Sequence, residues 1–172
     1  MTKLAIIDID GVIFDVSARR QRATKPDGTL DWKIFLDPSL IMLDIPVDGV
    51  TQAISHLMQL GYQLVLLTGR PEKLRQATIA GLIDADILWH DLLMRKDGDY
   101  RPSPILKTEE VLKYLDAHPA VDEVLFVDDQ SENLAAIQAA LDAREVACLC
   151  CNHLGFVVSL LSEAAEKEQC NG

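Results

Sequence analysis

The sequence of 172 residues has no long apolar run, no excess of positive charge and no spread of cysteines along its length. No apolar stretch approaches the roughly 18 residues that a membrane-spanning helix needs, so we do not expect a membrane protein. The chain carries 16 basic and 27 acidic residues, for a net charge of −11. This balance argues against a protein that coats nucleic acid by charge alone, because phosphate-backbone affinity comes from summed Lys and Arg. It leaves room for a local basic pocket.

The few cysteines all lie near the C-terminus, at Cys148, Cys150, Cys151 and Cys170. Their spacing matches neither a zinc site nor a disulfide framework, and it indicates a buried strand with thiols plus one thiol in the tail. The N-terminus lacks the cleavage site of a secretory signal, since acids follow its first apolar run directly. We therefore expect one domain over 1–172, in a reducing cytoplasm and with no obligate protein partner.

Short apolar runs alternate with segments of helical spacing along the chain. We expect strands at 4–7, 62–67, 87–89, 121–127 and 145–150. We expect helices at 48–60, from about 71 onward, and at 108–117, 132–142 and 156–168. This alternation predicts an α/β fold, a doubly wound parallel sheet with helices on both faces. Residues 11–46 fit the alternation poorly, so we predict a flap insert after the first strand and allow for a small hairpin within it.

Carboxylates directly follow two of the predicted strands. Asp8 and Asp10 come after the first strand, and Asp128 and Asp129 come after the fourth. Ligand sites in such sheets lie outside the carboxyl ends of the strands, so we expect these acids to converge there. A single aspartate would more simply cap a helix, but like charges about 4 Å apart repel by roughly 4 kcal/mol at an effective dielectric of 20. Mg²⁺ takes oxygen ligands and binds carboxylates together with substrate phosphates, so the pattern predicts a Mg²⁺ site.

Phosphate-binding groups follow the second predicted strand. Thr68 offers a hydroxyl, and Gly69 offers an unobstructed backbone N–H. Both come before an expected helix N-terminus, where anions are favoured. Thr68-Gly69-Arg70 is also an ordinary turn sequence. Twelve of the 16 basic residues gather in the flap, just after this strand and at 95–107. Solvated surface charge explains several of them. Lys107 is different, because a cation at the start of an expected helix needs a functional or packing reason.

These segments, in this order, resemble the four motifs of the haloacid dehalogenase-like (HAD) phosphohydrolases: Asp8-Ile9-Asp10-Gly11-Val12, Thr68-Gly69-Arg70, Lys107 and Asp128-Asp129. The resemblance spans positions 4 to about 142 and implies a HAD-like Rossmann-type fold. The chain is too short for a large cap domain, so it resembles a capless or minimally capped member.

Within that superfamily the chain is most similar to the phosphatase domain of polynucleotide kinase–phosphatase. The similarity lies in Arg19, nine residues after Asp10, in Arg70, and in the segment 95–101 with its arginines Arg95 and Arg101. One departure is that Ser103 and Pro104 stand where that domain carries acidic residues. The resemblance therefore supports a shared architecture and leaves the substrate open.

The resemblance also implies a role for each motif residue. Asp8 would attack phosphorus and form an aspartyl-phosphate, and Asp10, with a raised pKa, would protonate the leaving oxygen. Thr68 and the Gly69 N–H would hold phosphate oxygens, and Lys107 would neutralise the developing charge. Mg²⁺ would bind the Asp8 carboxylate, the Asp10 backbone carbonyl and Asp129, with Asp128 as a neighbour or second ligand. Substrate contacts would come from Gly69, Arg70, Arg19, Arg95 and Arg101.

We therefore expect a Mg²⁺-dependent phosphomonoesterase acting on a nucleotide or a nucleic-acid end. The alternative is a HAD-type phosphatase for small molecules or nucleoside monophosphates. Two further hypotheses are weaker. A phospho-accepting receiver domain would need an aspartate after a middle strand, and no aspartate follows the strand at 62–67. A nucleotide-binding pseudoenzyme would lack catalytic residues, whereas every motif residue is present. No kinase P-loop occurs in the chain, so a phosphorylating half is absent from it.

Overall fold

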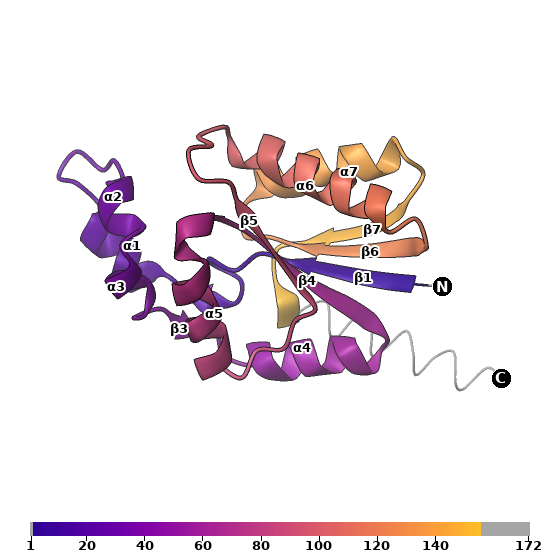
Figure 1. Cartoon of the computed structure of the whole chain (residues 1–172), viewed down its shortest axis with the longest axis horizontal. Helices are drawn as coiled ribbons and strands as arrows, with labels where there is room; N and C mark the ends of the chain where they lie inside the picture. The colour runs from indigo at the N-terminus through magenta and orange to yellow at the C-terminus, as the bar shows by residue number, and fades with distance from the viewer. Residues whose placement is uncertain (1, 156–172) are drawn as a thin grey trace.

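A five-stranded parallel sheet forms the centre of the computed structural model, which describes residues 2–155 (Figure 1). Its strand order is β5–β4–β1–β6–β7, and every neighbouring pair is parallel. The strands are β1 (Thr2–Ile7), β4 (Tyr62–Pro71), β5 (Asp91–Arg95), β6 (Val121–Val127) and β7 (Ala147–Cys151). The predicted helix 156–168 and Cys170 lie outside the described residues.

Helices cover both faces of this sheet, as Figure 1 shows, with α6 and α7 on one side and α4 and α5 on the other. Their bounds are α4 (Val50–Gln59), α5 (Arg75–Asp84, after a 3₁₀ turn at Glu72–Leu74), α6 (Ser103–Ala117) and α7 (Ser131–Asp142). A hydrophobic core lies on each face of the sheet. Alternate side chains of a strand point to opposite faces, so each strand contributes residues to both cores. Thus Ala5 and Ile7 of β1 join the core under α4 and α5, whereas Leu4 and Ile6 join the core under α6 and α7. The predicted doubly wound α/β fold is confirmed.

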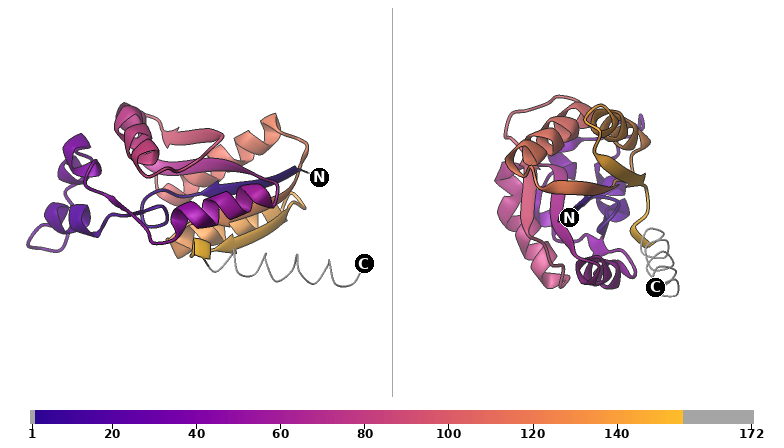
Figure 2. Two further views of the ribbon diagram at one scale, coloured as in Figure 1. Left: turned by 90° about the horizontal axis from the view of Figure 1, so that it is seen from below. Right: turned by 90° about the vertical axis from the view of Figure 1, so that its right-hand side faces the viewer.

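The insert after β1 is a flap of short elements that stands beyond the carboxyl ends of the strands (Figure 2). It consists of β2 (Phe14–Asp15), α1 (Ser17–Ala23), α2 (Trp32–Phe35), α3 (Pro38–Ile41) and β3 (Ile45–Pro46). The antiparallel pairing of β2 with β3 closes the base of the insert. Asp31 and Asp37 begin the helices α2 and α3, because each carboxylate accepts hydrogen bonds from the first N–H groups of its helix.

Two sequence predictions about element positions are wrong. The third strand is not 87–89 but β5, at Asp91–Arg95. Ile87 is buried in the core from a loop, so its apolar character did not mark a strand. The predicted helix 108–117 begins earlier, at Ser103, with Pro104 in its first turn, a position where proline costs no hydrogen bond. Lys107 therefore lies within α6 rather than at its start.

None of the helices within residues 2–155 combines the length and the apolar character needed to cross a lipid bilayer.

Adjacent residues of α5 offer a test of the core. Leu82 is fully buried, whereas Ile83 is 60% exposed. Leu82→Ala should lower the free energy of unfolding by about 2–5 kcal/mol, because it leaves a cavity under the sheet. Ile83→Ala should change it by less than about 0.5 kcal/mol. Chemical denaturation of both variants measures the difference, and equal losses would contradict the assigned face of α5.

Candidate active site

A buried lysine joins two carboxylates at the carboxyl edge of the sheet. Asp8 follows β1, and its backbone N–H donates to Val127 O at 2.9 Å, which keeps it in line with the end of β6. Lys107 Nζ lies 2.9 Å from Asp8 Oδ1 and 2.6 Å from Asp128 Oδ2. All three side chains are almost fully shielded from solvent. The strands and α6 thus bring together residues that are 120 positions apart in the chain.

Both carboxylate oxygens of Asp128 accept hydrogen bonds within the protein. Asn133 Nδ2 donates to both carboxylate oxygens at 2.9 Å, and the Gln130 N–H donates to Oδ1 at 2.9 Å. Together with Lys107, these donors occupy both oxygens. Asp129, by contrast, is exposed beside it. Oxygens of Asp8, Asp128 and Asp129 all lie within 4.8 Å of one another.

Gly11 makes room for Asp129. Its φ is +92°, and a Cβ at this position would lie 2.4 Å from Asp129 Oδ2 and 2.7 Å from its carboxyl carbon. No L-residue with a side chain fits there without moving the carboxylate, so the backbone after Asp10 forms a cradle for Asp129. Gly11 of the first motif thus leaves the space that Asp129 of the fourth motif occupies.

The crowded carboxylates suit a hard divalent cation. Burial raises the pKa of Asp8 to about 7, and Asp128 and Asp10 add to this rise, although Lys107 opposes it. Burial and the neighbouring Asp128 also raise the pKa of Asp129. The donors are all oxygens, and the cradle at Gly11 holds Asp129 toward the edge, which fits the preferences of Mg²⁺. Asp8 and Asp129 are the candidate side-chain ligands, because the oxygens of Asp128 are occupied.

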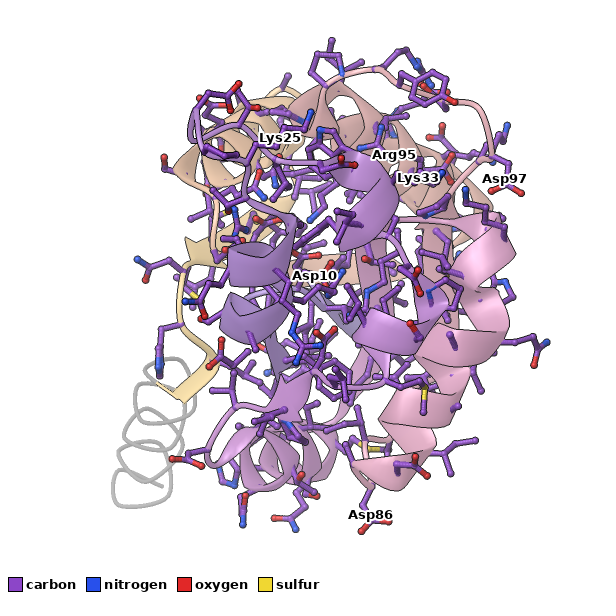
Figure 3. All side chains as sticks on the ribbon, turned by 90° about the vertical axis from the view of Figure 1, so that its left-hand side faces the viewer. Asp10, Lys25, Lys33, Asp86, Arg95 and Asp97 are labelled. Atoms are coloured by element: carbon purple, nitrogen blue, oxygen red, sulfur yellow. The ribbon has the colours of Figure 1, made fainter. Side chains whose placement is uncertain are left out.

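Asp10 lies near the middle of the view onto this edge, with Lys25, Lys33 and Arg95 above it (Figure 3). It is outside the carboxylate group formed by Asp8, Asp128 and Asp129. Arg19 Nη2 and Arg70 Nε each donate to Asp10 Oδ1 at 2.9 Å, and Arg70 Nη2 donates to the same oxygen. The predicted rise in its pKa is not observed. Burial would raise the pKa of Asp10, but the two guanidinium groups outweigh burial and lower it.

Arg19 and Arg70, which we predicted to contact substrate, are both buried and paired within the protein. Besides Asp10, both bind Asp44, a flap residue between α3 and β3. Arg19 also donates to the Phe35 carbonyl at 2.8 Å. In this structure the two arginines hold Asp10 rather than presenting free guanidinium groups. Sequence analysis missed Asp44, because no motif or strand end marks it.

Thr68 and Gly69 lie beside Lys107, and the predicted helical segment begins just after them, at Glu72. β4 continues to Pro71, a 3₁₀ turn follows directly at Glu72–Leu74, and α5 begins at Arg75. Thr68 Oγ1 accepts a hydrogen bond from the Arg70 N–H at 3.2 Å. Thr68, Gly69, Arg95 and Lys107 line one small hollow of about 10 Å³. The predicted phosphate-binding groups therefore lie around one hollow, just before a helical segment begins.

Arg95 and Arg101 have different positions at the site. Arg95 ends β5 and donates to the carbonyls of Gly69 at 3.0 Å, Asp99 at 3.0 Å and Arg101 at 2.8 Å, so it braces the loop before α6. Arg101 pairs with Asp99 and Glu109, and its side chain is 48% exposed. Arg95 lines the hollow, whereas Arg101 does not.

The sequence profile of the haloacid dehalogenase-like hydrolases matches residues 16–140. The chain belongs to this family. A chain of the Pnkp1/Rnl/Hen1 RNA repair complex is similar to it, with 25% identity and a TM-score of 0.65 over 89% of this chain and 43% of that one. This HAD-like chain thus spans less than half the length of that protein. No curated protein sequence matches it significantly.

Two other solved structures share the fold. A putative beta-phosphoglucomutase from Thermotoga maritima has 16% identity and a TM-score of 0.65, covering 95% of this chain and 99% of that one. A HAD-superfamily hydrolase of subfamily IA from Geobacter sulfurreducens has 19% identity and a TM-score of 0.59, covering 93% and 96%. Within residues 2–155 this HAD-like chain carries only the small flap after β1, and no large cap domain.

Two glycines of left-handed conformation test the cradle. Gly11 (φ +92°) contacts Asp129, whereas a Cβ added at Gly28 (φ +83°) in the flap would meet no atom within 4 Å. Gly11→Ala should displace Asp129 and reduce the rise in Tm that added Mg²⁺ causes by mass action. Gly28→Ala shares the backbone strain and should keep that rise. Thermal unfolding with and without Mg²⁺ measures both variants, and an unchanged rise in Gly11→Ala would exclude Asp129 as a ligand.

Proposed function

We propose that this chain is a phosphomonoesterase that depends on a divalent cation, Mg²⁺ by preference, and cleaves a terminal phosphate from a nucleotide or a nucleic-acid end. The observation that carries the proposal is the buried Asp8–Lys107 pair at the end of β1, beside Asp128 and Asp129. A carboxylate in this setting is oriented and electrostatically supported to act as a nucleophile. Membership of the hydrolase family supports the same reaction class.

In the first step, a carboxylate oxygen of Asp8 attacks phosphorus while the bond to the leaving oxygen breaks. Asp10 Oδ2 supplies a proton to that oxygen, since Oδ1 is occupied by the arginines. The arginines lower the pKa of Asp10 in the free protein, and the negative charge of the incoming phosphate acts in the opposite direction, because it favours the protonated carboxyl. In the second step, water attacks the phosphorus of the aspartyl-phosphate, its proton passes to Asp10, and the bond from phosphorus to Asp8 breaks. The products are an alcohol and inorganic phosphate.

The remaining residues stabilise charge. Lys107 Nζ neutralises Asp8 and the transferring phosphoryl oxygens, and the Thr68 hydroxyl and Gly69 N–H hold those oxygens in place. Asp8, the Asp10 carbonyl and Asp129 would hold the cation, which supplies charge neutralisation and orients the phosphoryl group. Asp128 keeps Lys107 in position through its bonds to Asn133 and Gln130. Catalysis in this scheme is positioning plus electrostatics.

Substrate choice rests on two observations. The similarity to a chain of an RNA repair complex, at 25% identity, supports a nucleic-acid end. The net charge of −11 favours a short end or a free nucleotide over a long tract, because a long tract needs many cationic contacts. The same charge also supports the second candidate, a phosphatase for nucleoside monophosphates or other small molecules.

We place the enzyme in the cytoplasm. Cys148, Cys150 and Cys151 are free thiols. The sulfur atoms of Cys148 and Cys150 lie 3.4 Å apart on β7. Such unbonded neighbours suit a reducing compartment.

Asp8→Asn should reduce Mg²⁺-dependent hydrolysis of p-nitrophenyl phosphate by at least about 1,000-fold, because the amide cannot form the phospho-enzyme. Asp142→Asn, at the exposed end of α7, is the matched control and should keep full activity. Release of p-nitrophenolate at neutral pH measures both variants. Substantial turnover by Asp8→Asn would remove Asp8 as the nucleophile.

A substrate panel separates the two candidate functions. Nucleoside 5′- and 3′-monophosphates are compared with short 3′-phosphorylated and 5′-phosphorylated oligonucleotides, with phosphate release as the measurement. We expect kcat/KM to be at least about 10-fold higher for a phosphorylated oligonucleotide than for the matching mononucleotide, since the flap adds contacts near the end. A preference for free mononucleotides would favour the second candidate.

A further inference from the structure

Asp44 is a buried flap carboxylate that the proposed chemistry does not use directly. It accepts from Arg19 Nε at 2.9 Å and from Arg19 Nη2 at 2.8 Å, one bond to each of its oxygens. Its Oδ2 also accepts from Arg70 Nη2 at 2.8 Å. The side chain is only 3% exposed. Asp44 thus binds both guanidinium groups that bind Asp10.

The four side chains form a closed, neutral cluster of two arginines and two aspartates. The arginine side chains are at most 1% exposed, whereas that of Asp10 is 20% exposed. Every described hydrogen bond to Asp10 from the cluster reaches Oδ1. Within residues 2–155 no side chain or backbone group donates to Oδ2. The cluster therefore fixes one oxygen of Asp10 and leaves the other available.

The partners of Asp44 come from different parts of the fold. Arg19 belongs to α1 in the flap, and Arg70 belongs to β4 in the sheet. Asp44 itself directly precedes β3, which pairs with β2 at the base of the flap. Arg19 is held further by the Phe35 ring, whose centroid lies 4.2 Å from the guanidinium carbon. Asp44 thus joins the flap to the sheet at the level of Asp10.

We propose that Asp44 is a positioning residue that clamps the Arg19 and Arg70 guanidinium groups side by side, so that together they orient Asp10 for proton transfer through its unbound oxygen. The inference rests on the proposed function, because it concerns the proton transfer that Asp10 carries out in that reaction. The clamp requires a carboxylate, because its two oxygens receive bonds from both arginines and separate two like charges that would otherwise repel. Without Asp44, the arginines have no common carboxylate partner among residues 2–155 other than Asp10.

The test compares substrates that differ in their need for a proton. The leaving oxygen of p-nitrophenyl phosphate is stable as an anion, whereas that of a nucleoside monophosphate is an alkoxide that needs protonation. We use kcat/KM, which covers the steps up to loss of the leaving group and is independent of phospho-enzyme hydrolysis. Asp44→Asn should lower kcat/KM for the nucleoside monophosphate by about 10- to 100-fold, because misplacing a catalytic group costs this much. The fold-loss in kcat/KM for p-nitrophenyl phosphate should be at least about 5-fold smaller than the fold-loss for the nucleoside monophosphate.

Two further variants complete the kinetic test. Asp44→Glu keeps the charge but shifts the carboxylate by one methylene, so it should fold even if Asp44→Asn does not, and it should show a smaller loss of the same selectivity. Asp27→Asn removes an exposed flap carboxylate that binds only Thr29 among the described residues and should leave both substrates unaffected. Equal losses for the two substrates in Asp44→Asn and Asp44→Glu would overturn the proposal, because a merely structural residue lowers both alike.

A measurement without substrate keeps the inference separate from the proposed function. The Arg19 and Arg70 Nε–H groups are buried and bound to carboxylates, so their ¹H–¹⁵N signals should exchange slowly in the wild-type protein. In Asp44→Asn the Arg19 signal should exchange at least about 10-fold faster, since its carboxylate partner is gone. Unchanged exchange would overturn the clamp. Wild-type protein that hydrolyses neither substrate would contradict the proposed function alone, and the exchange rates would still decide the clamp.

Discussion

The ion pair between Lys107 and two aspartates is the interaction on which the rest of the site depends. A parallel sheet brings the ends of β1 and β6 side by side, so Asp8 and Asp128 must lie close together whether or not their charges favour it. A buried pair of carboxylates would be strongly disfavoured alone. Lys107, held 2.9 Å from one and 2.6 Å from the other, makes the arrangement stable and leaves Asp129 on the outside for a cation.

A second ionic cluster begins two residues along the chain. Asp8 joins Lys107, whereas Asp10 joins Arg19, Arg70 and Asp44, so the short segment after β1 connects the sheet edge to the flap. The first cluster carries more acidic than basic groups and suits a cation. The second has equal numbers of both and is closed within the protein. In the proposed function this division of charge would separate a half of the site that holds the cation from a half that orients Asp10.

The small flap stands beyond the carboxyl edge of the sheet. Its cations Lys25 and Lys33 lie above Asp10 in the view onto the site, together with Arg95 of the sheet (Figure 3). These cations lie at the edge of the sheet that carries the candidate site, in a chain whose net charge is −11. Under the proposed function, these cations would attract a phosphate terminus.

Local patterns were enough to predict the doubly wound sheet, the family and the gathering of acids behind β1 and β6, because apolar runs and the polar residues that end them are contiguous in sequence. Such patterns misplaced β5, since the buried Ile87 looked like part of a strand, and they missed Asp44 entirely. They also left Arg19 and Arg70 as free substrate contacts. The carboxylate partners of these arginines lie 9 to 60 residues away in the chain, so only packing of the flap against the sheet decided which carboxylate each would meet.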